Sequence, residues 1–135
     1  MKVQGRCYCG AVRYEVEGEP MLRGQCHCRE CQYISGGGVN YVFAMPEAGL
    51  SYTKGKPASF QRSDLETPVT REFCSACGTH LMSRAPGLEG MVMIKVGTLD
   101  DPSVFGSPQM AIFHCDAQAF HSVPEGCSVF ERLPG

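Results

Sequence analysis

The spacing of the cysteines constrains this chain more than any other feature. Seven of the nine cysteines fall into three tight groups: Cys7 and Cys9 in CYC, Cys26, Cys28 and Cys31 in CHCREC, and Cys74 and Cys77 in CSAC, which Gly78 follows. In an extended segment, residues two apart point to one face, and a CxxC followed by glycine forms a tight knuckle. Each spacing therefore suits a tetrahedral metal ion held about 2.3 Å from sulfur.

Metal ligation is a better prediction for these thiols than a disulfide framework. The N-terminal MKVQGRCYCG reaches a cysteine before any apolar signal region, and no stretch approaches the roughly 20 apolar residues of a membrane span. We therefore expect a cytoplasmic protein, in which cysteines are metal ligands or catalytic thiols more often than disulfides.

Four plus three is the economical division of the seven cysteines. Cys7, Cys9, Cys74 and Cys77 would make a closed structural zinc site that ties the start of the chain to its middle. Such a site stabilises a small β domain because zinc binds the folded arrangement and not the open chain. The alternative is that some of these residues are buried free thiols.

The remaining group, Cys26, Cys28 and Cys31, leaves one tetrahedral position unfilled. Three protein ligands and an exchangeable fourth are typical of catalytic zinc. A fourth protein ligand would make this site structural too, and the candidates are His27, His80, His114, Cys115 and Cys127; His27 is disfavoured because it sits between two ligands. The spacing also permits one ion held by Cys7, Cys9, Cys26 and Cys28.

Short β-type stretches between glycines and prolines predict an all-β fold in a single domain over residues 1–135. We expect antiparallel strands within residues 11–18, 39–45, 69–73 and 91–97, and helical turns over residues 30–35 and 99–105. With 16 glycines and 9 prolines, long helices are not expected.

The charge balance points to small-molecule or protein partners. The 12 Lys and Arg against 14 Asp and Glu give a net charge of −2, and no basic run is present. We therefore expect neither nucleic acid nor a membrane as partner.

Together these motifs resemble the family of glutathione-dependent formaldehyde-activating enzymes and the related centromere protein V-like domains. The resemblance runs from CYCGAVRYEV through CHCRECQYISGG to EFCSACGTHL and VGTLDDP, in the order CxC, CxCxxC, CxxCG. It implies a compact β-tent fold with two zinc ions, a structural one on Cys7, Cys9, Cys74 and Cys77 and a catalytic one on Cys26, Cys28 and Cys31. The family's reaction joins glutathione to formaldehyde to give S-(hydroxymethyl)glutathione, and the reverse is a carbon–sulfur lyase reaction.

In that reaction the open zinc either binds the substrate thiol as thiolate or polarises the aldehyde oxygen, and we favour the first because a thiolate-rich ion prefers sulfur. No general base stands out among the histidines, which are His27, His80, His114 and His121. The carboxylates of glutathione have six candidate partners: Arg29, Lys54, Lys56, Arg62, Arg71 and Arg84.

The C-terminal part departs from the family. Where members commonly show a histidine and, some nine residues later, a tryptophan, this chain has Ala111 and Phe120, and it contains no tryptophan. We expect Phe120 to keep the apolar bulk, and Cys115 and Cys127 to be buried or partly buried thiols. Because the substrate rests on the resemblance, the alternative to an enzyme is a non-catalytic, zinc-stabilised binding or scaffolding module.

Overall fold

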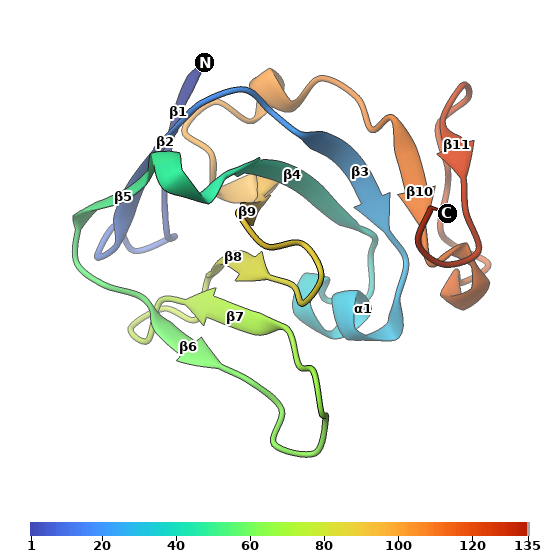
Figure 1. The fold of residues 1–135 in the computed structure, drawn as a ribbon, viewed down its shortest axis with the longest axis horizontal. Helices are drawn as coiled ribbons and strands as arrows, with labels where there is room; N and C mark the ends of the chain where they lie inside the picture. Colours follow the sequence, from blue (N-terminus) through green and yellow to red (C-terminus); the bar gives the residue numbers. More distant parts are fainter. Residues whose placement is uncertain (135) are drawn as a thin grey trace.

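The computed structural model describes residues 1–134 and confirms an all-β fold of two sheets (Figure 1). The smaller sheet is antiparallel, in the order β1 (Lys2–Arg6), β2 (Arg13–Glu17) and β5 (Leu50–Lys54). The larger sheet has eight strands, in the order β11 (Ser128–Val129), β10 (Met110–Ile112), β3 (Leu22–Cys26), β4 (Asn40–Pro46), β9 (Met91–Lys95), β8 (His80–Arg84), β7 (Thr70–Phe73) and β6 (Ala58–Phe60). The small sheet lies at one end of the molecule, and β10 and β11 lie at the other.

Helical structure is confined to short segments. The α-helix α1 spans Arg29–Ser35, and four 3-10 turns complete the description: η1 (Glu47–Gly49), η2 (Val96–Thr98), η3 (Pro102–Phe105) and η4 (His114–Asp116). Within residues 1–134, no helix has the length and apolar character needed to cross a bilayer.

Each of the four predicted strands is present, as β2, β4, β7 and β9, and the turn predicted at residues 30–35 is α1. The turn predicted over residues 99–105 is shorter, because a 3-10 turn forms only at Pro102–Phe105. The four predicted strands pair antiparallel, as expected, whereas β10, which was not predicted, pairs in parallel with both β3 and β11. A long crossover from β3 to β10 makes this possible, since parallel neighbours cannot be joined by a hairpin.

The main core lies between the two sheets. Val3 on β1 and Val16 on β2 are paired and buried, and they belong to the same apolar cluster as Phe43 and Ile94 of the large sheet. Close packing here also requires glycine at position 5, because a Cβ on Gly5 would lie 2.3 Å from the hydroxyl oxygen of Tyr14.

The opposite face of the large sheet carries the second cysteine group. A row of paired residues crosses five strands on this face: Arg71, Ser83, Met93, Ala44 and Leu22. Cys26 ends β3 on the same face, and the chain then enters α1, which returns it to β4 (Figure 1). The face therefore has a second buried cluster, made of Cys26, Cys31, Val42, Ala44 and Met93.

Candidate metal centres

The four-cysteine group, Cys7, Cys9, Cys74 and Cys77, joins the segment after β1 to the segment after β7. Its four sulfur atoms lie within 4.8 Å of one another, with Sγ to Sγ distances of 3.7 Å from Cys7 to Cys9 and 3.9 Å from Cys9 to Cys74. A tetrahedron with metal–sulfur bonds of 2.3 Å has edges of about 3.8 Å. The donor set and its spacing therefore fit a tetrahedral metal ion.

Two glycine turns shape this group. Gly10 and Gly78 have φ angles of +80° and +78°, which glycine adopts without strain. Their N–H groups donate to the carbonyls of Cys7 at 3.1 Å and Cys74 at 2.8 Å, so each cysteine segment folds back on itself. The N–H of Val12 also donates to the sulfur of Cys7 at 3.3 Å, which favours a thiolate there.

Thr79 links the two cysteine segments and was missed in the sequence. Its hydroxyl lies 3.1 Å from the sulfur of Cys77 and accepts the N–H of Tyr8 at 3.0 Å. The hydrogen bond from Thr79 is the main cause that lowers the pKa of Cys77, to about 5. The only signal for this role is the position of Thr79 directly after CxxCG.

The three-cysteine group, Cys26, Cys28 and Cys31, also has its sulfur atoms within 4.8 Å of one another. Cys28 is the N-cap of α1, and its sulfur accepts the N–H of Cys31 at 3.3 Å, so the first turn of the helix holds two of the three sulfurs together. Hydrogen bonds from Cys26 and Cys31 lower the pKa of Cys28 to about 2, and the charge of Arg71 acts in the same direction. Its hydrogen bonds with Cys28 and Cys31 raise the pKa of Cys26.

Within residues 1–134, no fourth Cys, His, Asp or Glu joins the three-cysteine group. His27 is buried with its ring facing the C-terminal segment, where its Nδ1 lies 3.1 Å from Nδ1 of His121 and its ring centre 5.3 Å from that of His114. The structure likewise separates Cys7 and Cys9 from Cys26 and Cys28, so the seven cysteines divide four plus three.

Outside the two groups, the expectations for the C-terminal part are partly wrong. Cys127 is half-buried, as expected, whereas Cys115 is exposed. Phe120 adds no bulk to the core, because 73% of the side chain is exposed and its ring packs edge-on against His121. Ala111 is fully buried on β10, where it pairs with Gln25 of β3 on one side and with Val129 of β11 on the other.

Polar side chains from the sheet approach the three-cysteine group. Asn40 lies on β4 and pairs with Cys26 of β3, and its Nδ2 donates to the sulfur of Cys31 at 3.6 Å. Lys95 on β9 is buried, and its Nζ has no hydrogen-bond partner within residues 1–134. Burial lowers the pKa of Lys95, whereas the neighbouring thiolate of Cys31 raises it. No sequence pattern indicated a role for Lys95, because a single lysine in an apolar strand resembles an edge residue.

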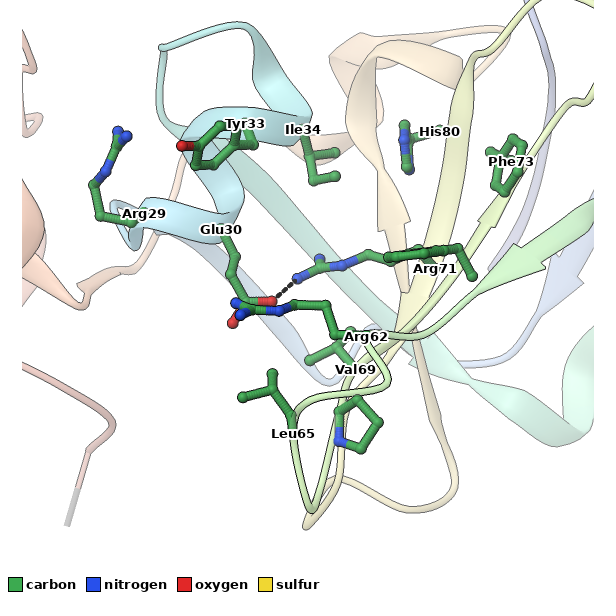
Figure 2. Close-up of a pocket in the computed structure, with 12 residues that line it drawn as sticks. Arg29, Glu30, Tyr33, Ile34, Arg62, Leu65, Val69, Arg71, Phe73 and His80 are labelled. Atoms are coloured by element: carbon green, nitrogen blue, oxygen red, sulfur yellow. Dashed lines mark hydrogen bonds and ion pairs between the residues drawn. The ribbon is translucent and has the colours of Figure 1, made fainter.

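A pocket of about 640 Å³ lies beside α1 (Figure 2). One wall is α1 itself, with Glu30, Tyr33 and Ile34, and the opposite wall carries Arg71 and His80 from β7 and β8. An ion pair of 2.9 Å between Arg71 and Glu30 joins the two walls. Glu30 lies between Cys28 and Cys31 in the sequence, so α1 borders both the pocket and the three-cysteine group. Arg71 also lines the pocket, and its charge acts on Cys28.

Three of the six predicted carboxylate partners line this pocket: Arg29, Arg62 and Arg71. Arg62 is paired with Asp64 at 2.6 Å. Lys54 and Lys56 are exposed and do not line it. Arg84 lies elsewhere, where it binds Glu72 at 2.5 Å and also Glu47. The apolar part of the lining comes from α1, from Phe60 at the end of β6, and from the segment between β6 and β7, which includes Leu65 and Val69.

Comparison with known proteins agrees with this arrangement. A solved structure of a Rhodobacter sphaeroides protein, a structural genomics target, has a TM-score of 0.61 and 21% identity over 78% of this chain and 96% of that one, so the fold is shared. A Halomonas elongata protein named "Putative glutathione-dependent formaldehyde-activating enzyme" is 30% identical over 86 residues. That match covers 60% of this chain and 55% of the relative, so the chain spans only a little over half of the relative's length.

The family model described as "Glutathione-dependent formaldehyde-activating enzyme" matches residues 2–116. This range contains both cysteine groups, α1 and all the residues that line the pocket. The chain therefore belongs to the glutathione-dependent formaldehyde-activating enzyme family.

Proposed function

We propose that this chain is a zinc-dependent carbon–sulfur lyase that forms or cleaves a thiol–aldehyde adduct such as S-(hydroxymethyl)glutathione. The observation that carries the proposal is a set of three converging sulfurs, Cys26, Cys28 and Cys31, with no fourth protein ligand within residues 1–134. Family membership supports the same class of reaction. We propose a structural zinc at the four-cysteine group and the working zinc at the three-cysteine group.

Zinc held by three thiolates supplies a soft Lewis acid that lowers the pKa of an incoming thiol from its ordinary value of about 8.5. In the adduct-forming direction, the thiolate sulfur attacks the carbonyl carbon and the carbon–sulfur bond forms. The π electrons of the carbonyl move to its oxygen, which takes up the proton that the thiol released. The reverse reaction breaks the same bond and returns the proton to sulfur.

The residues of the pocket would bind the rest of the thiol substrate. Arg29, which makes no ion pair within residues 1–134, is the candidate for a carboxylate of glutathione, and Arg62 could bind the second one by exchanging it for Asp64. Arg71 is already paired with Glu30, so its proposed role is to hold α1 against β7 and not to bind substrate. Tyr33, Phe60 and Leu65 would cover the ligand and exclude water.

The test is the exchange rate between free formaldehyde and its glutathione adduct, measured by NMR at increasing concentrations of the zinc-loaded protein. We expect a rate above the uncatalysed exchange that falls at least about tenfold in Cys28→Ser, because one ligand is lost. The matched control is Cys115→Ser, which changes an exposed thiol outside both groups and should leave the rate unchanged. An uncatalysed rate from protein with two zinc ions per chain would contradict the proposal and favour a binding module.

A further inference from the structure

The position of Lys95 on its strand places its side chain beside the three-cysteine group. Met93, two residues earlier on β9, is buried in one cluster with Cys26 and Cys31. Side chains two apart on a strand point to the same face, and Lys95 pairs with Val42, another member of that cluster. The side chain of Lys95 therefore lies on the face of the sheet on which the three sulfurs converge.

This lysine has no partner that the described chain supplies. Its side chain is 8% exposed, and its Nζ makes no hydrogen bond within residues 1–134. A buried, unpaired ammonium is strongly unfavourable, so a charged Lys95 needs a negative group close by, even one that makes no hydrogen bond to it.

The charges around Lys95 identify that negative group. The groups whose charge acts on Lys95 are the sulfurs of Cys31, Cys26 and Cys28, which a bound metal ion would hold as thiolates, and the guanidinium of Arg71. Arg71 is neutralised by Glu30 at 2.9 Å. His80 also faces Lys95, but burial and the two cations lower its pKa, which keeps it neutral. The negative charge available to Lys95 is therefore that of the three-cysteine group.

We propose that Lys95 is the fixed counter-charge of the three-cysteine group and makes its open position prefer an anionic ligand, a thiolate, over a neutral one. This inference rests on the metal site of the proposed function. A divalent ion with three thiolates carries about −1, which the ammonium balances, so that adding a thiolate leaves about −1 instead of −2. The four-cysteine group differs because one of its members, Cys9, is an exposed residue.

Cobalt(II) is the probe that separates this inference from the lyase activity. It replaces zinc in thiolate sites, and its visible absorption reports a change of the fourth ligand. The cobalt-loaded protein would be titrated with thiocyanate as an anion, imidazole as a neutral ligand, and glutathione. We expect Lys95→Met to weaken thiocyanate and glutathione binding about tenfold or more, because one buried positive charge beside the group is lost, and to leave imidazole binding unchanged.

Two further variants make the test decisive. Lys56→Met removes the same charge from an exposed position and should bind all three ligands as the parent does. Lys95→Arg keeps the charge and should keep the preference for thiocyanate, even if Lys95→Met loses its metal.

The inference is overturned if the parent protein shows no preference for the anion, or if Lys95→Met retains that preference with two cobalt ions bound. Loss of the preference in Lys95→Arg with metal retained would also overturn it. If the protein did not catalyse the formaldehyde reaction but still preferred the anion because of Lys95, the proposed function would be refuted and the inference about Lys95 would stand.

Discussion

At the scale of single residues, Thr79 shows how one hydroxyl supports a whole metal site. It lies 3.1 Å from the sulfur of Cys77 and accepts the N–H of Tyr8 at 3.0 Å, so it connects the segments that carry the two halves of the four-cysteine group. A sulfur that accepts a hydrogen bond is a more stable thiolate. Thr79 therefore contributes both to ligand charge and to the relative position of the two segments.

We expect Thr79→Val to lower the free energy of unfolding of the zinc-loaded protein by about 0.5–1.5 kcal/mol, because an isosteric side chain removes the hydrogen bonds to the N–H of Tyr8 and to the sulfur of Cys77. Thermal and denaturant unfolding would measure the loss. Thr53→Val is the matched control, since Thr53 is exposed on β5 and should tolerate the change. Equal unfolding free energies for the two variants would show that the hydroxyl does not support the site.

At the scale of elements, α1 is short but holds two of the three sulfurs. A helix of 7 residues is too short to be stable alone, so its ends must be fixed by the surrounding chain. Cys28 caps the N-terminus through its sulfur, and Gly36 ends the helix with a φ angle of +78° and an N–H that donates to the carbonyl of Gln32. The two capped ends therefore stabilise the helix that holds Cys28 and Cys31 in place.

Gly36→Ala should destabilise the protein by about 1 kcal/mol, because a residue with a Cβ is strained at a positive φ. Gly38→Ala is the control two residues later, where φ does not fall in the left-handed region and no atom would lie within 4 Å of the added Cβ. Denaturant midpoints of the two variants measure the difference. A loss of equal size in both would mean that the end of α1 does not depend on the left-handed glycine.

The same elements show how far the sequence could predict the fold. Alternating apolar residues identify β2, which has one buried face, and nearly continuous apolar runs identify β4 and β9, which are buried on both faces. The pattern misses β3, whose LRGQC lacks alternation because Gly24 and Gln25 are buried between neighbouring strands. It also misses β10 and β11, which have only 3 and 2 residues and pair in parallel with distant partners.

For the candidate site, the cysteine spacing was informative because neighbouring ligands lie on one turn or one strand. The partition of the seven cysteines depended on contacts between distant segments, such as Cys9 with Cys74, which spacing alone left open. Lys95 and the pocket walls depend on strand register, so no local pattern could reveal them. The assignment of a single domain over residues 1–135 and the roles of the ligands stay predictions.

At the scale of the whole molecule, the two cysteine groups hold different parts of the structure. Cys7 and Cys74 are buried in the core between the sheets, and their group connects β1 of the small sheet with β7 of the large one. The three-cysteine group connects only β3 with α1, which are close neighbours in the chain. An ion that closes a long loop constrains the unfolded chain more than one that closes a short loop.

The two groups should therefore differ when each loses a ligand. We expect Cys9→Ser to lower the unfolding temperature by much more than Cys28→Ser, since metal binding at the four-cysteine group is coupled to folding of the whole molecule. Cys9 is exposed and Cys28 half-buried, so lost packing does not account for a larger effect at Cys9. Calorimetry with native mass spectrometry would measure unfolding and zinc per chain, with Cys115→Ser as the control. If both variants kept two zinc ions, or if Cys28→Ser were the less stable, the long-range role of the four-cysteine group would be refuted.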